Sequence, residues 1–290
     1  VFSAPLGGFI YAIEELLHSA RPVVLLLVLI TTFSADTWAD VLGVFGLGSG
    51  AKGFQPNLGF LLERKFPIDV EFFPIDVIYL ISLGALIGVL AELYTRYVLM
   101  MQRQGQHWFG NRLILRMSLS GLVLGSVYAA LPSSFHNLDE LFHLIGASET
   151  GVTQALAGFV VLFFSTGLAA ASGAPGGLFM PMLTLGGAMG LACGDWVQSL
   201  TGHLPNTYVF AGMGAFVAGC SRTPITAMFL AFALVKDLLI LKPILVACLT
   251  SFLIARLFNP HSIYERQMSM ESADEKRTKS SKQLNQKVSS

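Results

Sequence analysis

The sequence predicts an all-α membrane protein with several spans, some of which are broken helices. Hydrophobic residues make up 53% of its 290 residues and charged residues 12%, and this charged share is about half that of an ordinary soluble domain. The mean hydropathy is +0.65. Apolar segments interrupted by Gly, Ser or Pro run through most of the chain. These observations exclude a soluble globular enzyme, a disordered chain and a coiled coil as the main interpretation.

The apolar segments follow one another closely from the N-terminal end. Residues 5–17 form the first and residues 21–33 the second, and a loop of mixed charge is expected over 35–72. Residues 74–101 are long enough to cross a hydrocarbon core of ~30 Å. Further spans are predicted near 113–131, 152–171, 178–200, 207–220, 224–235 and 240–258. Several are shorter than the roughly 20 residues that a full span needs, which indicates helices that end inside the membrane beside a polar cavity.

The distribution of charge predicts two regions and an orientation. Residues 1–264 form the transmembrane region, and residues 265–290 form a polar tail that we expect to be disordered. Segment 96–116 carries four arginines and no acidic residue, whereas segment 132–150 carries three acidic residues and no Lys or Arg. The positive-inside rule therefore places 96–116 and the tail in the cytoplasm. Basic and acidic residues number 18 each, so no nucleic-acid partner is indicated.

The first residues are not those of a secretory signal peptide, because residue 1 is Val and no charged segment precedes the apolar run. The stretch 1–5 is typical of the middle of a structural element, so we expect the chain to be part of a longer protein. Segments 3–9 and 222–228 share a Pro followed by an aliphatic residue and a helix-like run. This faint repeat fits two related halves that meet near the bilayer midplane.

The strongest candidate site is the stretch Ser172–Pro181, which reads Ser-Gly-Ala-Pro-Gly-Gly-Leu-Phe-Met-Pro and separates two apolar spans. A helix that begins near Leu178 would have first-turn N–H groups without intrahelical partners, at the positive end of its dipole. Such groups bind an anion without a formal positive charge, and this weaker hold permits release. The alternative is a Gly/Pro break that lets two helices pack closely.

Two adjacent carboxylates, Glu14 and Glu15, end the first apolar run. A carboxylate that is partly removed from water holds a proton more readily than one in bulk solvent, so either residue is a candidate proton carrier. The alternative is that both side chains simply extend to the membrane interface. Composition and position alone leave both interpretations open.

The motif at Ser172–Pro181 closely resembles the Gly-x-Phe-x-Pro anion-binding motif of the CLC family of chloride channels and chloride–proton antiporters. Two further blocks resemble family segments in the family order: Val1–Gly8 running into Glu14-Glu15, and Ala211–Ala215 running on to Arg222-Thr223-Pro224. The resemblance covers nearly the whole chain up to Tyr264. It implies an inverted-repeat architecture with an incomplete first half, and a homodimer with one anion pathway in each subunit.

The resemblance also implies roles for single residues. Gly177, Leu178 and Phe179 would form the anion site, the last two by their backbone N–H groups, and the hydroxyl of Tyr264 would reach the same ion. The alternative for Tyr264 is an aromatic anchor at the membrane interface. Glu15 would be the internal proton-transfer residue, with Glu14 beside it. Because channels of the family usually have an apolar residue at the Glu15 position, a glutamate there favours antiport.

The sequence also departs from the family. The first-half serine motif and the gating-glutamate motif occur nowhere in it and would lie before Val1. Without that glutamate the chain cannot couple protons to chloride by the family mechanism. The counterpart of Glu14-Glu15 in the second half is Ala233-Leu234, where many relatives keep a glutamate.

The leading hypothesis is therefore chloride transport, most simply chloride–proton antiport by the full-length protein. The alternatives are a passive chloride channel of the same fold, a subunit that only dimerises, and a membrane-embedded enzyme that would use Glu14 and Glu15 with histidines. The enzyme alternative lacks a nucleophile motif and a His-Glu-x-x-His pattern, so we expect no enzymatic activity. Chloride is the expected ligand, with no cofactor and no metal. Protons, a lipid bilayer and a second copy of the chain are the expected partners, in the inner membrane of a prokaryote. The dimer would use the apolar segments around 21–33, 224–235 and 240–258.

Overall fold

The computed structural model describes residues 5–16, 22–44, 76–109, 112–130, 145, 151–174, 176–201, 207–235, 237–270 and 272. Every regular element within these residues is a helix. The first half contains α1 (Pro5–Tyr11), the π-helix η1 (Ala12–Leu16), α2 (Pro22–Val44), α3 (Asp76–Phe109) and α4 (Leu113–Ala130). The second half contains α6 (Val152–Ser172), α7 (Phe179–Thr201), α8 (Thr207–Ser221), α9 (Pro224–Val235), the 3-10 turn η4 (Leu238–Ile240) and α10 (Leu241–Phe258). A further helical segment covers 263–270.

Three helical stretches of the described chain are long and apolar enough to cross a membrane: Asp76–Phe109, Val152–Ser172 and Leu238–Met270. Some of the other helices, such as α8 and α9, are too short for a full span. At 1.5 Å per residue, the 12 residues of α9 extend only ~18 Å, against ~30 Å of hydrocarbon. The prediction of an all-α membrane protein with helices that end partway is confirmed.

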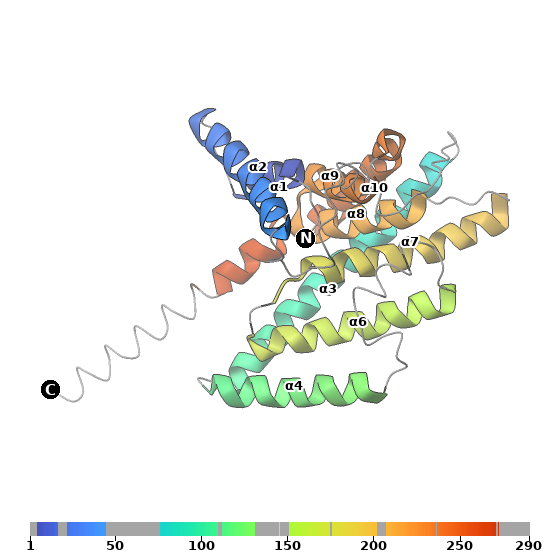
Figure 1. Cartoon of the computed structure of the whole chain (residues 1–290). Helices are drawn as coiled ribbons and strands as arrows, with labels where there is room; N and C mark the ends of the chain where they lie inside the picture. Colours follow the sequence, from blue (N-terminus) through green and yellow to red (C-terminus); the bar gives the residue numbers. More distant parts are fainter. Residues whose placement is uncertain are drawn as a thin grey trace.

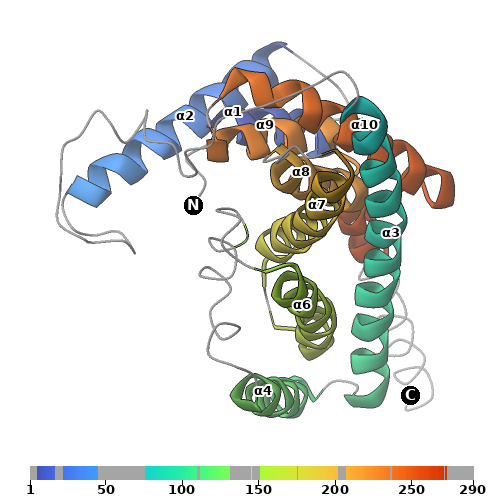
Figure 2. The same ribbon diagram turned by 90° about the vertical axis from the view of Figure 1, so that its right-hand side faces the viewer.

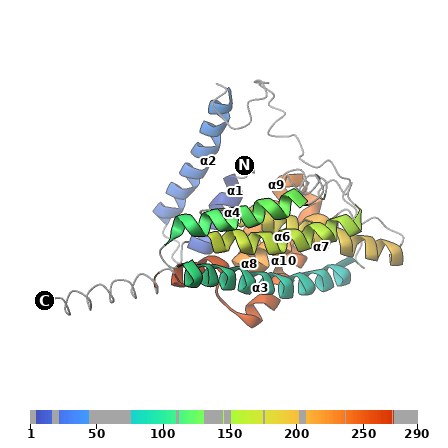
Figure 3. The same cartoon turned by 90° about the horizontal axis from the view of Figure 1, so that it is seen from below.

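The helices form a stack in which α4, α6, α7 and α8 lie side by side (Figure 1). The long helix α3 crosses this stack and packs against α6, α8 and α10, which is clearest along the end-on direction of Figure 2. Seen from below, α4 and α3 lie on two sides of the α6–α7 pair (Figure 3). All residues of α8 are buried, so this helix forms the centre of the molecule.

Close approach of α7 to α8 depends on glycine. A Cβ atom at Gly186 of α7 would collide with the carbonyl oxygen of Gly212 on α8, and a Cβ at Gly212 would meet the carbonyl oxygen of Gly186. Small residues at a helix contact let the backbones approach, which is the usual way that membrane helices pack. The outer faces are apolar: Ile114 of α4 is 82% exposed and Leu257 of α10 is also 82% exposed, as expected of surfaces that face lipid.

Most predicted spans agree with the helices to within one or two residues, but the ends of two spans were wrong. Helix α3 continues to Phe109 instead of ending at residue 101. Helix α2 continues to Val44 instead of ending at residue 33. Its polar residues fit a helix because Thr31 and Thr37 donate their hydroxyls to carbonyl oxygens four residues earlier, at 2.9 Å each. The tail boundary at 264/265 falls inside the helix 263–270. The tail beyond residue 272 lies outside the described residues.

The helix 263–270 begins with a capping box. The backbone N–H of Ser262 donates to Glu265 Oε2 at 3.2 Å, and the N–H of Glu265 donates to Ser262 Oγ at 3.1 Å. The Ser-x-x-Glu spacing is the recognised signature of such a cap. The same sequence signal therefore could have predicted this helix.

Candidate functional site

The turn between α6 and α7 places the predicted anion-binding motif. Gly173 ends α6 with a φ of 73°, and its N–H donates to Ala170 O, a left-handed C-cap that favours glycine. Ser172 Oγ accepts from the N–H of Ala174 at 3.0 Å. Gly176 and Gly177 follow as exposed residues. The chain thus leaves α6, passes through an open glycine pair and enters α7.

Helix α7 begins at the position expected from the sequence, next to Leu178. The N–H of Met182 donates to Leu178 O at 3.1 Å. The N–H groups of the preceding positions belong to the first turn, which has no acceptor within the helix. The side chains of Leu178 and Phe179 are half-buried against the hydrophobic core, so the backbone of this turn is fixed by packing.

Glu14 lies at the N-terminus of α9. Its Oε1 accepts from the N–H of Ile225 at 3.2 Å, and its Oε2 accepts from the N–H and the hydroxyl of Thr226, both at 2.8 Å. Helix α1 packs against α9, so the two segments of the faint repeat meet in the structure. A carboxylate at a helix N-terminus satisfies orphan donors and opposes the positive end of the dipole.

Glu15, the next residue, points to a different partner. Its Oε1 accepts from Ser262 Oγ at 2.5 Å. Both glutamates lie on the single π-helical turn η1, a type of turn that is common at functional sites. The two adjacent carboxylates therefore accept hydrogen bonds from different elements. Glu14 bonds to the start of α9, and Glu15 bonds to Ser262, which caps helix 263–270.

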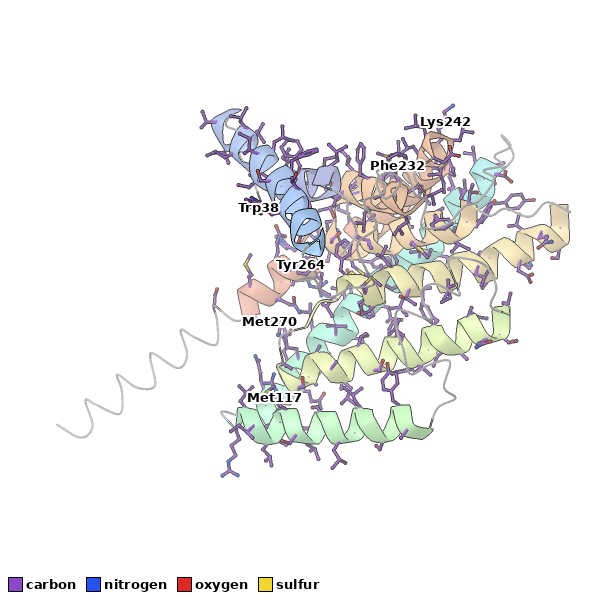
Figure 4. All side chains as sticks on the ribbon, viewed as in Figure 1. Trp38, Met117, Phe232, Lys242, Tyr264 and Met270 are labelled. Atoms are coloured by element: carbon purple, nitrogen blue, oxygen red, sulfur yellow. The ribbon has the colours of Figure 1, made fainter. Side chains whose placement is uncertain are left out.

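Tyr264 lies at the start of helix 263–270, two residues after Ser262 (Figure 4). Its ring packs edge-on against Tyr11 of α1, with 6.5 Å between the ring centroids. Tyr11 precedes Glu15 by one helical turn. The structure thus joins Glu15, Ser262, Tyr11 and Tyr264 in one group, of which sequence analysis found only Glu15 and Tyr264. The capping spacing at Ser262 and the four-residue spacing of Tyr11 from Glu15 were the available signals.

Sequence analysis missed a buried charge cluster centred on Glu92. Glu92 of α3 is only 3% exposed and bonds to the guanidinium groups of three arginines. The nearest is Arg222 Nη2, which lies 2.7 Å from Glu92 Oε2. Arg266 Nη1 lies 3.1 Å from Glu92 Oε1, and Arg96 Nε lies 2.9 Å from the same oxygen. We call these four residues the Glu92 cluster.

Arg222 also ties the cluster to the end of α10. Its guanidinium donates to the carbonyl oxygens of Ala255 and Asn259, at distances of 3.0–3.1 Å. The carbonyl oxygen of Ala255 also accepts from the N–H of Asn259 at 3.1 Å, so Arg222 bonds to the C-cap of α10. The φ of Arg222 is +62°, a backbone region that L residues rarely adopt. The network of bonds holds the residue in that conformation.

Within the described part of the chain, no group of three His, Cys, Asp or Glu side chains is arranged to hold a metal ion.

Comparison with known proteins gives consistent matches. Residues 1–256 match the family model described as Voltage gated chloride channel. The H(+)/Cl(-) exchange transporter ClcA of Cronobacter sakazakii is 28% identical over 272 residues, covering 91% of this chain and 55% of that protein. The protein of the same name from Klebsiella pneumoniae strain 342 is also 28% identical and is covered to 54%. The chain thus spans about half the length of the curated relatives it matches.

Solved structures show the same fold. A crystal structure titled a slow cyanobacterial Cl-/H+ antiporter aligns with a TM-score of 0.77 at 22% identity, covering 94% of this chain and 62% of that one. A CLC-type fluoride/proton antiporter aligns with a TM-score of 0.69 at 19% identity, covering 91% of this chain and 60% of that one. At these identities the similarity establishes the architecture alone.

Proposed function

This chain belongs to the voltage gated chloride channel family, also called CLC, and from that membership we propose that it is part of a chloride–proton antiporter. Relatives named H(+)/Cl(-) exchange transporter support antiport over passive conduction. The glutamate at position 15 supports the same choice, because this carboxylate is half-buried. The proposal assigns no enzymatic activity to the protein.

In this proposal chloride binds where α7 begins. Leu178 and Phe179 offer backbone N–H groups, and the exposed Gly177 has no side chain to block the approach of an ion. The positive end of the helix dipole adds to the attraction without a fixed positive charge. Tyr264 contributes its hydroxyl. The start of helix α7 at Phe179 supports this role, because first-turn N–H groups lie at the positive end of the helix dipole.

The observation that carries the proton half of the proposal is the hydrogen bond from Ser262 Oγ to Glu15 Oε1. This bond joins the protonatable carboxylate of Glu15 to Ser262, which precedes Tyr264 by two residues in the sequence. A carboxylate in a partly desolvated position can take up and release a proton while the anion site fills and empties. Glu14 accepts three hydrogen bonds at the start of α9, so in the proposal it orients η1 beside the proton-carrying Glu15.

The test is Glu15→Gln in the full-length protein, reconstituted in liposomes with chloride and proton fluxes recorded together. We expect proton flux to fall to background while chloride flux continues. Asp195→Asn is the matched control, since Asp195 is an exposed carboxylate on α7, and it should change neither flux. Coupled proton flux that persists in Glu15→Gln would remove Glu15 from the pathway. A wild-type protein that moves chloride without protons would instead be the passive channel.

We also propose that the protein works as a homodimer in a bacterial inner membrane, with its C-terminal end in the cytoplasm. Exposed apolar side chains on the segments predicted for dimerisation support this arrangement. Val23 and Leu26 of α2 are 69% and 57% exposed, and Leu253 of α10 is 58% exposed. Cross-linking in native membranes would test the dimer.

A further inference from the structure

A basic pocket lies on the outer side of the Glu92 cluster, between the C-terminal part of α3 and helix 263–270. Its volume is about 440 Å³, and its lining includes Arg96, Arg103 and His107 of α3 together with Arg266. None of the described residues that line it is acidic. The pocket shares no lining residue with the group formed by Glu15, Ser262, Tyr11 and Tyr264.

The positive charge around this pocket exceeds the negative charge. Glu92 supplies one carboxylate to three guanidinium groups, those of Arg96, Arg222 and Arg266. Arg103 adds a further cation that makes no ion pair with any described residue. Arg96 bonds to Glu92 through Nε and Arg266 bonds to it through Nη1, so each guanidinium retains further N–H donors. Several arginines around one pocket suit an anion with several oxygens, because the planar guanidinium binds phosphate oxygens in pairs.

The remaining lining residues are Gln104 and three apolar side chains. Trp108 is 70% exposed and Met100 is 53% exposed, whereas Leu99 beneath them is buried. A free inorganic anion would gain nothing from contact with these apolar side chains. A phosphate that is attached to a hydrophobic molecule would bind to the basic side chains through its oxygens and to the apolar side chains through its hydrophobic part.

The length and charge of α3 indicate that the pocket lies at the depth of lipid headgroups. The first 20 residues of α3, 76–95, extend ~30 Å, which is the thickness of the hydrocarbon core. We therefore place Arg96, the first basic residue of α3, at the membrane–water interface, where tryptophan is enriched. The basic segment 96–116 assigns this end to the cytoplasmic side. Basic pockets at this depth suit anionic lipid headgroups.

We propose that this pocket binds the phosphate headgroup of an anionic phospholipid of the cytoplasmic leaflet. The phosphate contacts Arg96, Arg103 and Arg266, and the glycerol and upper acyl region contact Trp108 and Met100. Arg266 is two residues from Tyr264, so the bound lipid stabilises the position of the helix that carries this tyrosine. The binding step does not depend on the proposed antiport.

The experiment measures lipid binding by the full-length protein in nanodiscs of phosphatidylcholine, with or without phosphatidylglycerol. Thermal unfolding and native mass spectrometry report stabilisation and bound lipid. We expect phosphatidylglycerol to raise the Tm and to remain bound. Arg103→Gln should weaken its binding about tenfold, equal to about 1.4 kcal/mol, and His107→Gln should weaken it less. Both residues are exposed, so the variants are expected to fold.

Arg112→Gln is the matched control, because Arg112 is an exposed arginine beside α4 that does not line the pocket. It should retain the full response to phosphatidylglycerol. Equal binding of phosphatidylglycerol by the wild type, Arg103→Gln and His107→Gln would overturn the proposal. Inorganic phosphate is the third arm. If phosphate alone gave the same Arg103-dependent stabilisation, the lipid assignment would be wrong and the ligand would be the free anion.

Discussion

Replacing Glu92 with glutamine should destabilise the protein more than any other single change in the Glu92 cluster. The side chains of Arg222 and Glu92 are 6% and 4% exposed, and their charged atoms are 2.7 Å apart. Removing one partner of a buried ion pair leaves an uncompensated charge and costs about 3–5 kcal/mol. For a chain of this size, that loss corresponds to a fall in Tm of roughly 6–20 °C.

The assay is thermal unfolding of the purified protein in detergent, followed by tryptophan fluorescence. Arg96→Gln is the matched control, because the Arg96 side chain is 57% exposed while it bonds to the same carboxylate. An exposed pair contributes less than about 1 kcal/mol, so this variant should lose less than about 4 °C. If Glu92→Gln lowered the Tm no more than Arg96→Gln does, the buried cluster would not be a source of stability.

Two further changes test the packing and the caps. Glu14→Ala should lower the free energy of unfolding by about 1–2 kcal/mol, since it removes the cap of α9. Glu14→Gln keeps one acceptor oxygen and should lose less, so equal losses in the two variants, measured by denaturant titration, would show that the hydrogen bonds of this cap do not contribute. Gly186→Val should abolish a monodisperse peak in size-exclusion chromatography, because its Cβ would collide with Gly212. Gly125→Val, at a position with open space, should behave as wild type, and normal behaviour of both variants would contradict the close α7–α8 contact.

The fold was largely predictable because hydrophobic segments in a membrane protein are long and local. The span expected over 152–171 is Val152–Ser172 in the structure, and the helix start near Leu178 is confirmed by α7. The end of α2 was missed because polar residues there suggested a loop, whereas threonine hydroxyls bond to the helix backbone. Helix 263–270 was missed because the charge of the tail outweighed its capping box.

The site was predictable only where it has a local pattern. The glycine-rich turn and the pair Glu14-Glu15 are visible in the sequence, and the resemblance to a family suggested their roles. The Glu92 cluster joins residues that lie 130 and 174 positions apart. A single Glu and a single Arg carry no signal of such a pairing, because the contact is created by helix packing. For the same reason Ser262, 247 positions from Glu15, was not recognised as its partner.

The most direct test of chloride–proton antiport is whether a chloride gradient drives protons uphill. The full-length protein would be reconstituted in liposomes with a chloride gradient and equal pH on both sides. We predict that chloride moving down its gradient moves protons in the opposite direction and creates a pH difference. This pH difference should be absent in Glu15→Gln. Chloride movement without any pH change in the wild-type protein would contradict antiport.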